Sequence, residues 1–263
     1  ATILSVSNQS ISDLTGIEDF LSLITLSCHS NQLTILDVSQ NTSLAWLDCS
    51  YNQLTILDVN STALTQLECG ENQLTSLDVS QIISLTYLGC INNQLTTLDV
   101  SGTTSLAFLY CDQNQLTLLN LSNNIDLQGL NCSDNQLATL DLSNNIALDD
   151  FFCTNNLLTT LDLRNGNNIN MATQMYIISN PNLNCINVDD AMWSTSNWTV
   201  SNGNIDPQHY FSANCSAIGI KEHTTNKELL QIIDVLGREK EQKNQPLFYI
   251  YDDGTVEKKI IIK

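Results

Sequence analysis

Basic residues are nearly absent from most of this sequence. Residues 1–220 contain 20 acidic side chains and one basic side chain, that of Arg164, whereas residues 221–263 contain eight of each kind. The formal net charge of −19 therefore belongs entirely to the first of these two parts. Proteins bind nucleic acids and anionic membranes mainly through Lys and Arg, which neutralise phosphate groups. The scarcity of bases argues against nucleic acid or a lipid surface as a partner.

Two further absences narrow the function. No apolar run approaches the roughly 20 residues that a membrane helix requires, so we expect no insertion into a membrane. The three histidines stand in unrelated contexts, and we find no nucleophile elbow, phosphate-binding loop or metal motif. Adjacent acids such as Asp149 and Asp150 need not face one another across a substrate, as the acids of a glycosidase do. We predict that the protein is not an enzyme and needs no cofactor.

What the chain does contain is a short repeat marked by cysteine. Each copy reads L-x-x-L-x-C-x-x-N-Q-L-T-x-L-D-V-S-x-N, with small variations. A fixed, short period means that one small unit is copied along an axis and buries its apolar side chains only against its neighbours. The pattern predicts a solenoid. We call the repeated cysteines the ladder cysteines; they recur at a nearly constant interval, at Cys28, Cys49, Cys69, Cys90, Cys111, Cys132 and Cys153.

The repeat resembles the leucine-rich repeat family, whose signature L-x-x-L-x-L-x-x-N-x-L it contains with Cys in the third apolar position. The match covers about residues 23–165. Residues 54–59 repeat the spacing of residues 44–49, as in nested bacterial repeats, and residues 1–22 resemble an internalin-type repeat that forms the first coil. The resemblance implies a mostly β leucine-rich repeat solenoid, with parallel strands on a concave face and short strands and turns on a convex face.

The end of the chain resembles a different family. The phrases V-L-G-R and Y-I-Y-D-D-G-T-V-E-K-K are similar to the type A sorting domain of the type IX secretion system, although the usual first strand with a P-N-P phrase is absent. Apolar runs on both sides of Asp253 and Gly254 predict a hairpin, and residues 229–235 predict a third strand. The resemblance implies a secreted or cell-surface protein of a Gram-negative bacterium, with the type IX machinery as a partner. An ordinary capping hairpin is the alternative.

These boundaries divide the chain into four parts. We expect a first coil in residues 1–22, seven leucine-rich repeats in residues 23–165, a C-terminal cap in residues 166–218 and a small β-sheet sorting domain in residues 219–263. In an exported protein, the two cysteines that bracket the Trp-containing cap, Cys185 and Cys215, suggest a disulfide. Closing this loop would stabilise the fold by roughly 3–4 kcal/mol on the chain-entropy model.

The ladder cysteines are predicted to be buried free thiols. They occupy a position that Leu or Val fills in related repeats, where a thiol behaves as a small apolar side chain. Neighbouring coils would place them about 4.8 Å apart, within disulfide reach by distance, but seven cysteines cannot all pair. Their linear arrangement also does not suit zinc, which needs a tetrahedral cluster.

Two polar ladders accompany the cysteines. The ladder asparagines, at Asn31, Asn52, Asn72, Asn93, Asn114, Asn135 and Asn156, are expected to satisfy backbone groups where the chain leaves each strand. The second row points outward from the second half of the repeat, and we expect hydrogen bonds from backbone amides or from Ser and Thr to offset the repulsion between its carboxylates. We call its acids the ladder aspartates; they are Asp37, Asp58, Asp78, Asp99, Asp141 and Asp162, with Asn120 in the same row. A row of weakly bound calcium ions is the alternative, at Asp37, Asp58, Asp78 and Asp99.

The aromatic residues give the functional prediction. Six of the seven aromatic residues between positions 23 and 163 fall on outward positions of the concave sheet, while Phe151 replaces a core Leu. Large, varied side chains on one face of a uniform scaffold are typical of a binding surface. We predict an adhesion or ligand-binding surface for an extracellular protein or glycan, formed by Trp46, Asp48, Tyr51, Glu68, Tyr87, Phe108, Tyr110, Asp112 and Phe152.

Three alternatives to a binding surface stay open. The aromatic side chains could merely stabilise the sheet through cross-strand contacts, as Tyr87 and Phe108 would. The protein could also be a purely structural component of the cell surface. An outward row of threonines could instead bind ice, although the neighbouring aspartates would keep that face charged and hydrated. These threonines are Thr34, Thr55, Thr75, Thr96, Thr117 and Thr159.

Overall fold

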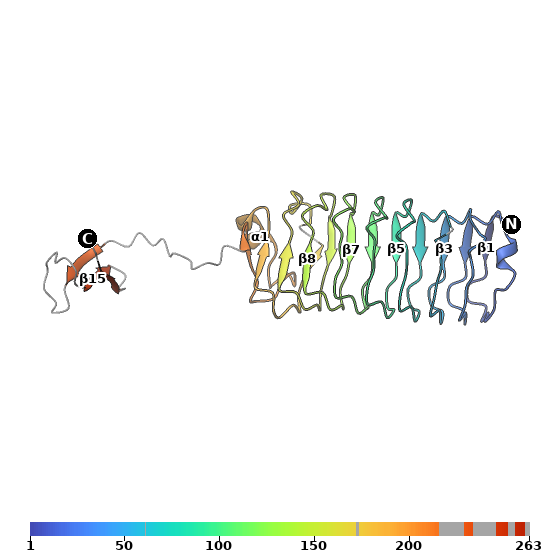
Figure 1. Ribbon diagram of the computed structural model, residues 1–263, viewed down its shortest axis with the longest axis horizontal. Coiled ribbons are helices and arrows are strands. Elements are labelled where there is room, and N and C mark those ends of the chain that lie inside the picture. Colours follow the sequence, from blue (N-terminus) through green and yellow to red (C-terminus); the bar gives the residue numbers. More distant parts are fainter. Residues whose placement is uncertain (61, 172–173, 216–228, 234–245, 252–255, 261–263) are drawn as a thin grey trace. The chain divides into compact units, whose positions relative to one another are not determined.

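The computed structural model describes residues 1–215, apart from 61 and 172–173, together with residues 229–233, 246–251 and 256–260. The chain forms two compact units, Ala1–Cys215 and Ser216–Lys263. In the first unit, successive coils of the chain stack along a single axis (Figure 1). Among the described residues, no helix has the length and apolar character needed to cross a membrane.

A nine-stranded parallel sheet runs along one side of the first unit. Each coil contributes one short strand, and the register places each central Leu opposite the next, as Leu26, Leu47 and Leu67 show. The period of the sequence therefore becomes the spacing of the strands. The strands are β1 (Ile3–Ser5), β2 (Thr25–Ser27), β3 (Trp46–Asp48), β4 (Gln66–Glu68), β5 (Tyr87–Gly89), β6 (Phe108–Tyr110), β7 (Gly129–Asn131), β9 (Asp150–Phe152) and β11 (Met175–Tyr176).

The second half of the repeat forms a shorter parallel sheet. Its strands, in spatial order, are β13 (Tyr210–Ser212), β12 (Cys185–Asn187), β10 (Thr160–Asp162) and β8 (Thr139–Asp141). Earlier coils make only isolated bridges in the same half, between Asp37 and Asp58 and between Asp78 and Asp99. Short strands are therefore found in the predicted half of the repeat. They pair into a continuous sheet only in the last coils of the stack, from β8 to β13.

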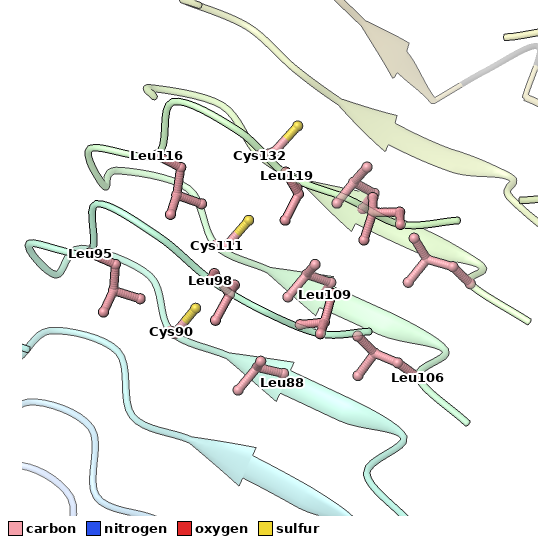
Figure 2. Close-up of a cluster of buried hydrophobic side chains, with 14 of the residues drawn as sticks. Leu88, Cys90, Leu95, Leu98, Leu106, Leu109, Cys111, Leu116, Leu119 and Cys132 are labelled. Carbon is pink, nitrogen blue, oxygen red and sulfur yellow. The ribbon is translucent and has the colours of Figure 1, made fainter. Parts of the chain in front are cut away.

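Leucines and the ladder cysteines form most of the core between the two halves (Figure 2). All seven ladder cysteines are free and fully buried, which confirms the prediction of core thiols. Burial raises the pKa of the Cys28 and Cys90 thiols to about 12, with a smaller contribution from a nearby aspartate in each case. These thiols therefore stay protonated at neutral pH and pack as apolar groups.

The ladder asparagines close the turn after each long-sheet strand. The Asn114 side-chain amide donates to the carbonyl oxygens of Cys111 in its own coil, at 3.1 Å, and of Cys90 in the preceding coil, at 3.0 Å. Its side-chain oxygen accepts the backbone N–H of Leu95 at 3.0 Å. Both contacts between coils therefore reach the preceding coil.

Residues 166–215 are more regular than the predicted cap. Strand β11 extends the long sheet, β12 and β13 extend the short sheet, and the helix α1 (Ala191–Asn197) follows β12. Asn180 takes the place of a ladder asparagine, because its amide donates to the Cys153 carbonyl and its oxygen accepts the backbone N–H of Leu158. The expected disulfide joins Cys185 to Cys215.

At the other end, the first coil forms as expected. Strand β1 pairs with β2, and a short 3₁₀ helix, η1 (Ile17–Asp19), follows. Leu4, Val6, Ile11 and Leu14 pack partly buried against the core, whereas Phe20 is 39% exposed.

The second unit contains a three-stranded antiparallel sheet. Its strands are β14 (Leu229–Ile233), β15 (Pro246–Tyr251) and β16 (Val256–Ile260), with β15 in the centre. β15 and β16 form the two arms of the predicted hairpin, and β14 supplies the predicted third strand. The predicted turn at Asp253 and Gly254 lies outside the described residues.

Candidate functional site

Eight of the nine predicted binding residues are exposed or half-buried on the outward side of the long sheet, whereas Asp112 is buried. We call this surface the sheet face; it comprises the first and third residues of the long-sheet strands and the two residues after each ladder cysteine. Trp46, Tyr87 and Phe108 are first residues of their strands, and Tyr110 and Phe152 are third residues. All five are half-buried, while the central residue of each of these strands is fully buried. The alternation expected of a strand therefore places these aromatic side chains outward.

Tyr51 lies on the sheet face just beyond β3 and is 59% exposed. Its φ of 54° lies in the left-handed region, which a bulky residue rarely adopts. The same conformation occurs immediately before every ladder asparagine, so the repeat accounts for the backbone but not for the ring. The equivalent residues are Ser30, Glu71, Asn92, Gln113, Asp134 and Asn155.

Several aromatic rings contact one another across the strands. The Tyr87 ring centroid lies 6.4 Å from that of Phe108 and 5.5 Å from that of Tyr110. Farther along the stack, Phe152 stacks on Tyr176 at 5.5 Å with an interplanar angle of 10°. Sequence reasoning missed Tyr176, although the phrase M-Y-I-I-S-N repeats the spacing of F-F-C-T-N-N and could have identified it.

Two glycines let neighbouring side chains lie close to the sheet. Gly89 pairs with Glu68, and a Cβ added at Gly89 would collide with the Glu68 carboxylate. Gly129 pairs with Phe108, and a Cβ there would approach the ring Cδ1 atom to 2.8 Å. Because these glycines have no side chain, the Glu68 carboxylate and the Phe108 ring can lie close to the sheet.

A hollow of about 420 Å³ opens on the sheet face over β3, β4 and β5. Three aromatic side chains, Trp46, Tyr51 and Tyr87, line it. Three acids line it as well, Asp48, Glu68 and Glu71, together with Ser50, Gln66, Gly70 and Ile91. Five of the nine predicted binding residues therefore meet in one concavity. Phe108, Tyr110, Asp112 and Phe152 lie farther along the stack, in the coils of β6 and β9.

The carboxylates on the sheet face are partly removed from water. Burial raises the pKa of Glu68, the Tyr87 hydroxyl lowers it by hydrogen bonding, and Asp48 raises it again. Burial also raises the pKa of Asp112, whose Oδ1 atom has no hydrogen-bond partner in the described part of the chain. The one base of the first unit, Arg164, forms an ion pair with Asp162 in the short sheet. The sheet face is thus rich in acids and aromatic side chains.

The ladder aspartates are held by local hydrogen bonds. The Asp37 side chain accepts the backbone N–H of Ser39 at 2.9 Å, and Asp78 and Asp99 accept those of Ser80 and Ser101. These bonds lower the pKa of all three aspartates. Within the described residues, no group of three His, Cys, Asp or Glu side chains could hold a metal ion. The calcium alternative therefore gains no support.

The threonine row lies in the same half of the repeat as the ladder aspartates. These threonines are exposed. The residue that follows each of them is also exposed, and its size varies from coil to coil, as Ile35, Ser76 and Leu118 show. A flat, regular array of hydroxyl and methyl groups is therefore not formed, and the ice-binding alternative gains no support.

No protein-family model matches the chain, and no curated protein matches it in sequence. A leucine-rich repeat protein of Leptospira interrogans is 26% identical over 75% of this chain, with a TM-score of 0.56. A plant peptide hormone receptor in complex with RGF2 is 21% identical over 67% of this chain, with a TM-score of 0.54.

A domain of InlJ from Listeria monocytogenes, described as including a cysteine ladder, is 31% identical over 71% of this chain, with a TM-score of 0.38. The chain spans 48%, 34% and 59% of the Leptospira, plant and Listeria structures respectively, which is less than two thirds of each. The parallel strands and the match to the Leptospira protein confirm the predicted fold class, a leucine-rich repeat solenoid.

Proposed function

We propose that this leucine-rich repeat solenoid is a non-enzymatic binding module that acts outside a Gram-negative cell and holds its ligand on the sheet face. One observation carries the proposal: all six outward aromatic side chains of the repeats protrude from the same face of the stack. The ligand is an extracellular protein or a glycan, because aromatic side chains interleaved with carboxylates suit both. Adhesion to another cell or surface is the role that such a module would serve.

Sheet stabilisation explains only part of the aromatic set. Tyr87, Phe108 and Tyr110 contact one another, and such cross-strand pairs contribute to stability. Within the described part of the chain, however, neither Trp46 nor Tyr51 has a ring partner. Tyr51 is exposed and Trp46 is half-buried, and large rings at the surface that make no ring contact are better explained by contact with another molecule.

The acidity of the sheet face favours a polypeptide ligand over a neutral glycan. A polypeptide can present Lys and Arg side chains whose charge complements the carboxylates, whereas a neutral sugar cannot. The plant receptor in complex with RGF2 is an example of this fold in use as a peptide receptor. At 21% identity that likeness concerns the fold alone, so the assignment rests on the composition of the sheet face.

Export is inferred from the end of the chain. Residues 219–263 resemble a type IX sorting domain, and their described strands form a small antiparallel sheet of the kind expected. A disulfide in the first unit agrees with an oxidising compartment. Fusing residues 219–263 to a periplasmic reporter enzyme, in a bacterium with a type IX system, should send the reporter into the medium or onto the cell surface. A reporter that stays in the periplasm would show that the segment is an ordinary hairpin domain.

Binding can be tested with a matched pair of triple variants. Binding partners would be collected on a glycan array and by pull-down from neighbouring cells. Replacing Trp46, Tyr87 and Phe108 with Ala should weaken binding at least tenfold, because three large contact side chains are lost. The control replaces Ile35, Ile56 and Leu118, which are exposed on the second half of the repeat, with Ala and should leave binding unchanged. Equal binding by both variants would contradict the proposal.

A further inference from the structure

The hollow over β3, β4 and β5 exists because one side chain is missing from the repeat. Gly70 follows a ladder cysteine, at a position where the adjacent coils carry Ser50 and Ile91. A Cβ at Gly70 would lie 3.1 Å from the Ile91 carbonyl oxygen and 3.5 Å from the Ile91 Cβ atom. At Gly70 the hollow is therefore lined by backbone alone, whereas the equivalent positions in the two adjacent coils carry side chains.

The aromatic walls of the hollow are not required by the fold. Trp46 and Tyr87 stand on β3 and β5, one on each side of β4, whose first residue is the smaller Gln66. Tyr51 closes a third side, from a left-handed position that short polar residues occupy more readily. Three aromatic side chains therefore border a space that no side chain of the repeat fills.

The charge of the hollow is of a single sign. Asp48, Glu68 and Glu71 line it, and no basic residue is among its lining residues. The Glu68 carboxylate lies directly over Gly89, where an added Cβ would collide with it. Burial of the Glu68 carboxylate with no cation among the lining residues carries an unfavourable free energy, which a bound cation would relieve.

We infer that this hollow binds the cationic end of an Arg or Lys side chain presented by a partner polypeptide, an inference that rests on the proposed function of the sheet face. A guanidinium or ammonium group is attracted to the faces of Trp and Tyr. Carboxylates beside those rings accept charge-assisted hydrogen bonds, which a planar guanidinium can donate in parallel pairs. A neutral sugar would use the rings but would leave the carboxylate charge uncompensated.

The inference can be tested with small probes on the intact protein. N-acetyl-arginine amide and the uncharged isostere N-acetyl-citrulline amide would be titrated into 15N-labelled protein, with the Trp46 indole signal as the readout. We expect saturable shifts with the arginine probe and at least fivefold weaker binding of the citrulline probe. Equal binding of the two probes, or no shift with either, would overturn the inference.

Variants separate a specific site from a general effect of negative charge. Glu68→Gln with Glu71→Gln should weaken binding of the arginine probe at least fivefold. The control, Asp58→Asn with Asp99→Asn, removes the same charge from the ladder aspartates and should change binding less than twofold. If the control weakens binding as much as the first pair, the attraction is nonspecific and the inference fails.

A filled hollow provides an independent variant. Gly70→Ile introduces the side chain that the repeat already carries at position 91, at the cost of a small shift around the Ile91 carbonyl. It should abolish binding of the arginine probe while far-ultraviolet circular dichroism stays unchanged. Retained binding in a folded Gly70→Ile protein would overturn the inference.

Failure of the inference differs from failure of the proposed function. If the arginine probe does not bind, but a captured partner is still lost on replacing Trp46, Tyr87 and Phe108, the cation site is wrong and the sheet face remains the binding surface. A captured partner that binds this triple variant normally would overturn both.

Discussion

At the scale of single residues, each ladder asparagine shows how one side chain can satisfy backbone groups in two neighbouring coils. Asn114 is buried and satisfies three carbonyl oxygens and one backbone N–H in two coils. The turn it closes depends on these bonds, so loss of the amide would leave buried backbone groups without partners. Each such group costs about 1–3 kcal/mol.

Asn114→Ala should therefore lower the free energy of unfolding by about 2–4 kcal/mol. The neighbouring Gln115→Ala is the matched control, because the Gln115 side chain is exposed and its backbone bond to Leu95 is kept. Urea unfolding followed by circular dichroism would measure both. A loss of stability in the control as large as in Asn114→Ala would show that the amide contacts contribute little.

Glu68 should make stability depend on pH in a direction opposite to that of Asp78. The folded state raises the pKa of Glu68, chiefly by burial, so the ionised carboxylate destabilises the fold once the pH exceeds its ordinary pKa. Glu68→Gln should then raise the unfolding free energy at pH 7 and leave it unchanged at pH 3, where glutamate is protonated in both states. Gln can still accept the Tyr87 hydroxyl.

Asp78→Asn supplies the control of opposite sign. Hydrogen bonds from Ser80 lower the pKa of Asp78, so its charged form stabilises the fold above the ordinary aspartate pKa. This variant should lose stability at pH 7 and lose less at pH 3. Urea midpoints at the two pH values decide the matter, and a destabilising Glu68→Gln at pH 7 would contradict the assignment.

The sequence predicted which residues face outward but not how they meet. The two-residue alternation of a strand places Trp46, Tyr87 and Phe108 on one face from the period alone. The position of the Glu68 carboxylate over Gly89 depends on pairing between coils, and the hollow depends on Gly70 lacking a side chain. Neither follows from the composition of one repeat, because each arises from differences between adjacent repeats.

At the scale of elements, the positions of the strands follow from the sequence where the period is constant but not where it changes. The period is nearly constant across residues 23–165, so their long-sheet strands follow from the ladder cysteines. In the coil that contains β11, Ile177 replaces the cysteine, and the step from Asn156 to Asn180 is longer than any step between ladder asparagines. The longer coil and the helix α1 hid the continuation of both sheets into residues 166–215, a part of the chain for which the sequence predicts only a cap.

The disulfide fastens this last part of the stack. Cys185 begins β12, and Cys215 follows β13, the edge strand of the short sheet. Replacing both cysteines with Ser should lower the unfolding free energy by about 3–4 kcal/mol, as expected for closing a loop of this length. A reducing agent should destabilise the natural protein equally and leave the double variant unaffected. If the reductant weakened the double variant as well, the ladder cysteines would have to contribute.

At the scale of the whole molecule, repulsion between like charges opposes the stacking of the coils. Stacking identical units brings like charges into rows, with coils about 4.8 Å apart. Exposed carboxylates at that spacing repel by roughly 1 kcal/mol per pair in water. The backbone amides beside the ladder aspartates offset part of this repulsion locally, but no amide neutralises the net charge of −19.

Salt should therefore stabilise the protein through screening. The Debye length falls from about 10 Å at 0.1 M to about 3 Å at 1 M, so repulsion between neighbouring coils weakens as NaCl is added. We expect the midpoint of thermal unfolding to rise steadily with NaCl concentration. Calcium chloride at the same ionic strength should act no more strongly than magnesium chloride, because the described residues offer no group of three acidic side chains to one ion. Stabilisation by micromolar calcium would instead indicate that calcium ions bind specifically along the ladder aspartates.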